Sequence, residues 1–177
     1  MRVEFGRCSF EGMEGFEVVA DGSAAGLSLS DCPSHGGACG SSFCLTLVRV
    51  QRLYPSVADI SENPEDLRIE SFPSSIVLTT IPAEHAGSPL DLARTVIREM
   101  GKHLRQFELH FCHEDISSGL PFAMAQFSFN INFPLAQLII VRQVGTELAL
   151  TVMTVPPSEI ITGWSVLRRF VESVLLT

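Results

Sequence analysis

Three cysteines and one histidine lie close together in the stretch CPSHGGACGSSFC, as Cys32, His35, Cys39 and Cys44. Thiolate and imidazole groups are the ligands that zinc prefers in closed tetrahedral sites, and the glycines between them permit tight turns. The spacing C-x2-H-x3-C-x4-C matches no common zinc knuckle or ribbon, however. The sequence therefore favours a Gly/Ser-rich loop with free thiols, with a metal-binding or redox module as the alternative.

A second set of chemically capable side chains lies in HFCHED, which supplies His110, Cys112, His113, Glu114 and Asp115. In a strand, successive side chains point to opposite faces, so we expect His110 and Cys112 on one face and His113 and Asp115 on the other. Free cysteine is among the most buried residue types. We therefore interpret Cys112 as a small core residue and the acidic residues as a solvated strand end.

The common linear signatures of hydrolases, zinc proteases and nucleotide-binding proteins do not occur in the sequence. One tryptophan and one tyrosine are too few for a platform that stacks nucleic acid bases. We therefore expect a protein that is not an enzyme and that holds no cofactor and no metal.

The segment FAMAQFSFNINF, residues 122–133, alternates in polarity and is predicted to be a strand. Its two expected faces are an apolar core face and a second face of mainly small, uncharged polar residues. The first comprises Phe127, Phe129, Ile131 and Phe133; the second comprises Phe122, Met124, Gln126, Ser128, Asn130 and Asn132. Uncharged polar groups among apolar ones can meet another protein at low desolvation cost, so the second face is either solvated or a protein-binding surface.

Composition narrows the classes of partner. Hydrophobic residues make up 46% of the 177 residues and charged residues 18%, so more apolar surface than usual must be buried or used. Acidic residues outnumber basic ones by 20 to 12, which argues against nucleic acid and anionic membranes. The sequence shows no export signal and no apolar stretch that could span a bilayer, and with five cysteines we expect reduced thiols in the cytoplasm.

The first half of the chain is predicted to form strands around a long loop. We expect strands over residues 2–10, 15–20 and 44–53, with a flexible loop over 21–43. A further pair of strands is expected over 66–73 and 74–82.

The second half begins with a helix that starts at the N-cap Ser88, with Pro89 at the first position and Asp91 in a capping box. It is amphipathic and ends near Gln106. Its apolar residues are Leu92, Val96, Ile97, Met100 and Leu104, and its basic residues Arg94, Arg98, Lys102 and Arg105 lie mainly elsewhere on the surface.

Four strands should follow over 107–116, 122–133, 135–145 and 146–156, joined by short connections as an antiparallel meander. A last helix is expected over EIITGWSVLRRFVESVL (159–175), capped by Ser158, with Ile161, Trp164, Leu167, Val171 and Val174 near one face. The predicted fold is one α+β domain over 1–177, with a mainly antiparallel sheet of six or more strands flanked by two main helices.

The order of elements over residues 74–177 resembles the DcrB-like domains of the PsbP-like α/β/α sandwich superfamily. The segments that carry the resemblance are SSIVLTTIP, SPLDLARTVIREMGKHLRQF, FELHFCHEDISSGLPFAMAQFSFNI and LAQLIIVRQVGTELALTVMTVP. The turn from Gly119 to Ala123 looks like the family's Gly-x-Pro-Ala turn, whereas Gly15-Phe16 stands where the family usually has Gly-Trp.

The resemblance implies a protein-binding function. The superfamily includes lipoproteins, photosystem subunits, a Ran-binding nuclear transport factor and cytosolic chaperones of type VI secretion. Those chaperones shield apolar helices of secreted effectors in a groove on a curved sheet, commonly as dimers. This chain is nearest in character to them, which implies a cytosolic chaperone or adaptor, with a structural subunit of a larger complex as a further alternative.

Overall fold

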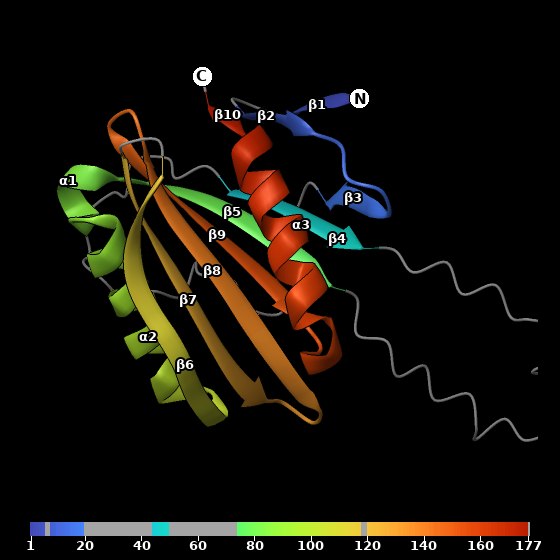
Figure 1. The fold of residues 1–177 in the computed structure, drawn as a ribbon, viewed down its shortest axis with the longest axis vertical. Helices are drawn as coiled ribbons and strands as arrows, with labels where there is room; N and C mark the ends of the chain where they lie inside the picture. Colours follow the sequence, from blue (N-terminus) through green and yellow to red (C-terminus); the bar gives the residue numbers. More distant parts are fainter. Residues whose placement is uncertain (6–7, 20–43, 50–73, 118–119, 177) are drawn as a thin grey trace, which may run out of the picture.

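The main body of the protein is a seven-stranded antiparallel sheet with the strand order β3-β4-β5-β9-β8-β7-β6 (Figure 1). The computed structural model describes residues 1–5, 8–19, 44–49, 74–117 and 120–176. The strands of this sheet are β3 (Phe16–Val19), β4 (Cys44–Arg49), β5 (Ser75–Pro82), β6 (Arg105–Ser117), β7 (Leu120–Asn130), β8 (Pro134–Val144) and β9 (Glu147–Val155). The predicted α+β fold with a mainly antiparallel sheet is confirmed.

A second, three-stranded sheet joins the two ends of the chain. Its order is β1-β2-β10, with β1 (Arg2–Phe5), β2 (Cys8–Glu11) and β10 (Leu175–Leu176). The prediction of one continuous strand over 2–10 was wrong, because β1 and β2 pair with each other as an antiparallel hairpin. Figure 1 shows β1 and β10 at the top of the view, near the end of α3 (Ile160–Ser173), with β2 between them in the sheet.

Three helical segments besides α3 complete the described fold. The short α1 (Ala83–Ala86), which we did not predict, follows β5, and the 3-10 helix η2 (Pro157–Glu159) precedes α3. The helix α2 (Pro89–His103) starts with the predicted capping box, since Ser88 and Asp91 satisfy each other's backbone N–H groups. It ends before the predicted Gln106, which has a positive φ of 52° and already belongs to β6.

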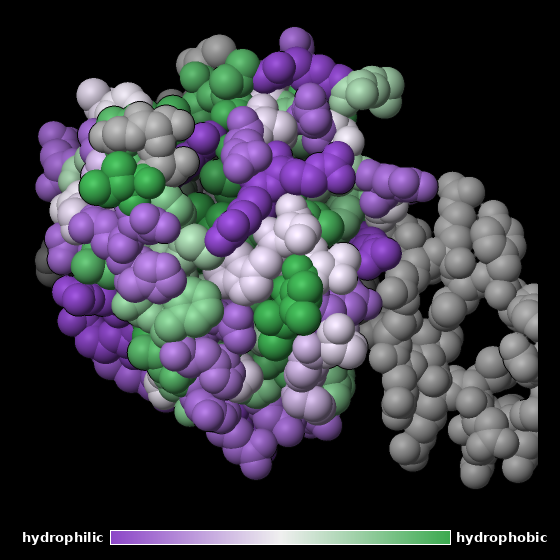
Figure 2. Space-filling model, viewed as in Figure 1, coloured by the Kyte–Doolittle hydropathy of each residue, from purple (hydrophilic) through white to green (hydrophobic). Residues whose placement is uncertain are grey.

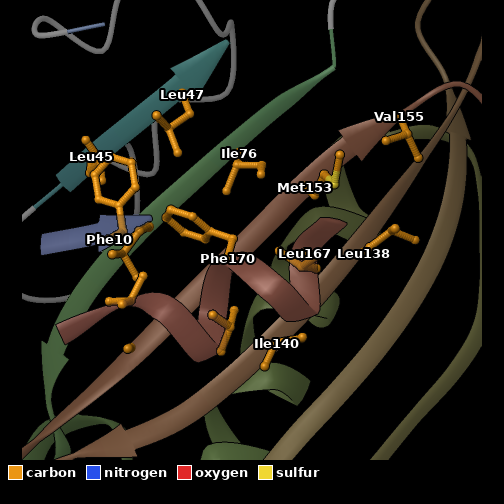
Figure 3. Close-up of a cluster of buried hydrophobic side chains, with 14 of the residues drawn as sticks. Phe10, Leu45, Leu47, Ile76, Leu138, Ile140, Met153, Val155, Leu167 and Phe170 are labelled. Carbon is orange, nitrogen blue, oxygen red and sulfur yellow. The ribbon is translucent and has the colours of Figure 1, made fainter. Parts of the chain in front are cut away.

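The sheet separates two hydrophobic clusters. On one side, α2 covers Phe127 and Phe129 of β7 together with apolar residues of β8 and β9. On the other side, α3 and the β1–β2 hairpin cover β4, β5, β8 and β9 (Figure 3). Phe10 and Phe170 meet edge to face there, with ring centroids 5.4 Å apart, so the last helix holds the hairpin to the sheet.

The four-strand meander β6–β9 is confirmed, with one correction at the end of β7. The strand stops at Asn130, and residues 131–133 turn the chain so that Pro134 pairs with Asn130. As a result, Ile131 and Phe133, which we expected in the core, are 48% and 41% exposed.

Some predicted elements lie outside the described residues. These are the loop over 21–43, the strand over 66–73 and the end of the predicted strand 44–53 beyond Arg49. That the chain is one domain stays a prediction.

Candidate functional site

The edge strand β6 contains two irregularities that decide where its side chains point. The pairing with β7 shifts between Arg105 and Glu108, and again between Leu109 and Phe111. At the second bulge two residues of β6 face one residue of β7. Strict alternation therefore fails between Leu109 and Phe111.

This bulge overturns the predicted arrangement of His110 and Cys112. The Nε2 atom of His110 lies 2.9 Å from Oγ of Ser128, on the α3 side of the sheet. Cys112 packs against the cluster on the α2 side. The two side chains thus lie on opposite faces, while His113 lies opposite Cys112 as predicted and contacts the ring of Phe111.

Cys112 behaves as a packed thiol. It is half-buried, and desolvation raises its pKa, with a smaller opposing effect from the Arg94 guanidinium. A raised pKa lowers the thiolate fraction at neutral pH, and the thiolate is the reactive form. The interpretation of Cys112 as a core residue agrees with this environment.

The first candidate cluster cannot be assembled from the described residues. Cys32, His35 and Cys39 lie outside them, and Cys44 is the first residue of β4. Within the described ranges, no group of three or more His, Cys, Asp and Glu side chains could hold a metal ion. The metal-binding alternative for the four residues stays untested.

The predicted polar face of β7 lies beside α3. Met124 belongs to the α3-side cluster, and Gln126 accepts a hydrogen bond from α3, so alternate residues of β7 from Phe122 to Asn130 share this face. Asn132, which we also expected there, lies beyond the end of the strand.

We define the β6–β7 strip as the part of this face that lies beside α3 and is not covered by it. It comprises Phe111 and His113 of β6, Phe122, Met124, Gln126, Ser128 and Asn130 of β7, and Ile161, Trp164 and Arg168 at the near side of α3. The main contacts of α3 with the large sheet are to β8 and β9, which places the strip next to the helix. Figure 1 shows β6 and β7 to one side of α3.

Trp164 forms the boundary of the strip. Its indole Nε1–H donates a 2.9 Å hydrogen bond to Oε1 of Gln126. Its ring stacks on Phe111 with centroids 5.8 Å apart and an interplanar angle of 25°. One side chain of α3 thereby reaches across β7 to the edge strand.

Ile161 and Arg168 extend this boundary along α3. Ile161, Trp164 and Arg168 follow one another at i, i+3 and i+7 and so share one side of the helix. Arg168 reaches β7, with Nη2 at 3.9 Å from Sδ of Met124. Ile161 is 85% exposed, although its helical spacing predicted a core position.

The strip combines apolar, aromatic and uncharged polar groups. The strip residues of β7 carry no charge, and Arg168 is the one permanent charge among the residues that define the strip. Glu108 and Asp115 of β6, which pair with Ser128 and Phe122, share this face and place a negative charge toward each end of it. Gln126, Ser128 and Asn130 are all half-buried. Figure 2 shows this side of the molecule, where pale and green residues gather in the middle of the view between hydrophilic purple margins.

Sequence reasoning located the β7 part of the strip but missed the contributions of β6 and α3. The alternation of FAMAQFSFNINF was enough to place Gln126 and Ser128 on one face. The participation of Phe111 depends on the bulge, for which the sequence gives no clear signal. The helical spacing predicts a core face that includes Ile161 and Trp164, whereas the structure leaves Ile161 exposed and Trp164 half-buried beside Arg168.

Comparison with known proteins supports the fold. No protein-family model matches the chain, and no curated protein matches it in sequence. Among solved structures, cyanobacterial PsbP (CyanoP) from Synechocystis sp. PCC 6803 has a TM-score of 0.57 at 13% identity, covering 100% of this chain and 92% of that one. The chain has a PsbP-like sandwich fold.

Two further structures share this fold. The Ran-binding protein Mog1p of Saccharomyces cerevisiae has a TM-score of 0.57 at 10% identity and covers 99% of this chain and 94% of its own. PA94, a protein of unknown function from Pseudomonas aeruginosa, has a TM-score of 0.51 at 13% identity. The match covers 75% of this chain and 83% of PA94. The PsbP-like part of the predicted resemblance is therefore confirmed at the level of the fold.

Proposed function

We propose that this chain is a non-enzymatic protein-binding domain and that the β6–β7 strip holds an apolar helix of its partner. The observation that carries the proposal is the uneven covering of the sheet. On one side, α2 packs on β6, β7 and β8, whereas on the other side α3 packs mainly on β8 and β9.

The width of the strip suits one helix. Neighbouring strands lie about 4.8 Å apart, and packed helices lie about 8–10 Å apart. A helix lying alongside α3 at that distance would be centred about two strands away, over β6 and β7. Trp164 and Ile161 would then contact it from the side, and Phe111 and Met124 from below.

The chemistry of the strip also suits an apolar partner. Aromatic side chains supply large contact areas, and Tyr or Trp rings are favoured at interfaces for this reason. Gln126 and Ser128 already have partners in Trp164 and His110, so covering them leaves few unpaired polar groups. A charged strip would instead oppose an apolar partner through the cost of desolvation.

Ser128 of the strip and His110, which lies beside the strip on the same side of the sheet, have the spacing of a nucleophile and a base, with Oγ and Nε2 2.9 Å apart. Acyl transfer also requires donors that stabilise the oxyanion, and a third group that orients the histidine. The described contacts of the pair consist of its mutual hydrogen bond. We therefore assign Ser128 and His110 a role in hydrogen bonding at the surface.

Two finer proposals concern the partner and the setting. By analogy with the DcrB-like chaperones, we propose that the partner is a secreted effector with an apolar segment and that the chain acts in the cytoplasm. Three observations support this: the mean hydropathy is +0.28, the β7 residues of the strip are uncharged, and a protein of the same fold is described as Ran-binding. In the described part of the chain, no helix is long and apolar enough to cross a membrane.

Trp164 makes the proposal directly testable, because it is the single tryptophan of the chain. The probe is a lysine-flanked Leu/Ala helical peptide with about 20 apolar residues. Its binding should remove water from the indole, shift the tryptophan emission to shorter wavelength and saturate with peptide concentration. An emission spectrum that the peptide leaves unchanged would contradict the proposal.

A matched pair of variants locates the binding. Ser128→Arg places a long charged side chain in the strip, opposite Glu108. It should weaken peptide binding at least about tenfold, because an apolar helix lying over the strip would desolvate the charged groups. Thr162→Arg makes a similar change at an exposed position on the far side of α3 and should bind like the parent. Equal binding by both variants would place the peptide elsewhere, and circular dichroism checks that each variant is folded.

A homodimer is a further expectation from the resemblance, and the same fluorophore tests it. If a second copy occupied the strip, dilution of the protein alone would shift the Trp164 emission to longer wavelength as the dimer dissociates. Sedimentation over the same concentrations would show the change in mass.

A further inference from the structure

The outer surface of α2 carries a row of basic side chains. Arg94, Arg98 and Lys102 follow one another at i, i+4 and i+8, which places them along one face of the helix. All three are exposed, and the side chains of Arg98 and Lys102 are 67% and 57% accessible. The buried residues of the helix, such as Ala93 and Ile97, lie on the side that faces the sheet.

This row contrasts with the charge of the rest of the protein. The segment 92–107 contains four of the chain's 12 Lys and Arg residues and one of its 20 Asp and Glu residues. Elsewhere, eight basic residues stand against 19 acidic ones. A positive surface therefore lies on one helix of a chain whose net charge is −8.

Glu99, the one acidic residue in this segment, holds two of the basic groups in place. Lys102 Nζ lies 2.8 Å and Arg98 Nε lies 3.6 Å from the same carboxylate oxygen. The hydrogen bond from Lys102 lowers the pKa of Glu99, so the carboxylate stays ionised at neutral pH. Asp91 at the start of the helix is the other nearby carboxylate, and its pKa is lowered by hydrogen bonds from Ser88 and, to a smaller extent, by the charge of Arg94. Two carboxylates cannot neutralise three cations, so the row keeps a net positive charge.

We propose that this basic row on α2 is a second interaction surface, which binds an acidic segment of a polypeptide partner. The charges match in sign, and their spacing of about 6 Å along the helix axis lets successive carboxylates of one segment reach successive cations. The surface is separate from the β6–β7 strip, because α2 and α3 lie on opposite sides of the sheet. One partner could therefore be held at an apolar and an acidic segment, or two partners could bind together.

The short range of electrostatic attraction favours a peptide as the partner over a membrane or a nucleic acid. Under physiological salt, electrostatic interactions extend about 8 Å, so a short segment on α2 is attracted mainly by the row itself. An extended polyanion also meets the surplus of acidic residues on the rest of the protein and is repelled. The exposed positions of α2 that surround the row are Asp91, Thr95, Gly101 and His103, so no exposed large apolar side chain is available to enter a bilayer.

The test uses a fluorescein-labelled peptide of about ten glutamates, with its binding followed by fluorescence anisotropy. We expect saturable binding that weakens when the salt is raised from low concentration to about 0.15 M. A lysine peptide of equal length is attracted to the acidic surplus elsewhere on the protein, so its binding should not respond to Arg98→Gln. If the affinity for the glutamate peptide is the same at low salt and at about 0.15 M salt, the proposal is overturned.

Matched neutralisations assign the binding to α2. Arg98→Gln should weaken peptide binding about fivefold, since the removed charge lies in the row. Arg169→Gln removes an exposed arginine from α3 and should change it less than about twofold. Glutamine has nearly the helix propensity of arginine, so neither change should unfold its helix. Equal losses in the two variants would mean non-specific attraction and would overturn the proposal.

Vesicles of phosphatidylserine and phosphatidylcholine distinguish the membrane alternative. Sedimentation with the anionic vesicles should not exceed that with the neutral ones. Suppose that the anionic vesicles bind the protein, that Arg98→Gln weakens this binding, and that the glutamate peptide does not bind. The surface is then a lipid-binding one, and the proposal is wrong. The test is independent of the β6–β7 strip, because it reads a different side of the sheet.

Discussion

Trp164 and Gln126 are joined by a 2.9 Å hydrogen bond that links α3 to β7 across the edge of the candidate binding surface. The donor is an indole N–H and the acceptor is a side-chain amide oxygen, and both side chains are half-buried. The bond positions the indole for its stacking on Phe111. Its removal should therefore be visible in both stability and fluorescence.

Gln126→Leu keeps the approximate size of the side chain and removes the acceptor. The indole N–H then loses its partner in a half-buried site, which should lower the free energy of unfolding by about 1 kcal/mol. Urea denaturation measures this, and the Trp164 emission of the folded variant should change. Unaltered stability and emission would show that the bond contributes nothing.

Gly163 and Gly101 should respond to alanine with opposite signs. A Cβ at Gly163 would lie 2.9 Å from Leu138 Cδ1 and 3.2 Å from Val155 Cγ1, so Gly163→Ala should destabilise the protein by about 1–3 kcal/mol through overpacking. A Cβ at Gly101 would meet Phe107 at an ordinary 3.4 Å.

Gly101→Ala should therefore raise stability by up to about 1 kcal/mol, from helix propensity alone. The pair is checked by thermal unfolding of both variants. Stabilisation by Gly163→Ala would mean that Leu138 moves aside and that α3 is less tightly packed than its contacts indicate.

Phe170→Ala should be among the most damaging single substitutions. The ring is fully buried between the sheet and the N-terminal hairpin and meets Phe10 edge to face. Removing a buried phenylalanine costs about 3–5 kcal/mol. If the aromatic contact is the main link, Phe10→Ala should release the hairpin, so that hydrogen exchange quickens in β1 and β2 while β7 and β8 stay protected.

The capping box of α2 gives a prediction about pH. Hydrogen bonds from the Ser88 hydroxyl and backbone N–H lower the pKa of Asp91 below its ordinary value of 3.8. A carboxyl group whose pKa is lowered by folding stabilises the protein above its ordinary pKa, and that contribution is lost as pH falls through the lowered value. The stability difference between the parent and Asp91→Asn should thus be constant near neutral pH, begin to fall at about pH 3.8, and vanish only below the lowered pKa.

Ser88→Ala tests the other half of the same box. It removes the acceptor for the backbone N–H of Asp91 and should cost about 1 kcal/mol at pH 7. Ser165→Ala, at an exposed position inside α3, is the control and should have little effect. A difference between Asp91→Asn and the parent that persisted in acid would show that the carboxylate charge is not the stabilising feature.

The sequence by itself determined the elements whose signals are local. Ser88, Pro89 and Asp91 specify the start of α2 within a single turn, and the alternation of FAMAQFSFNINF specifies the two faces of β7. Short connections between four strong strand patterns were enough for the meander.

Only the tertiary structure decided which surface is left open. The bulge that turns His110 to the α3 side depends on pairing with β7, and the exposure of Ile161 depends on where α3 crosses the sheet. Likewise, β10 exists because the two ends of the chain meet at β2. Contacts between residues far apart in sequence determine these features. A pattern within one segment cannot encode them, because it records the polarity of each side chain but not which distant segment covers that side chain.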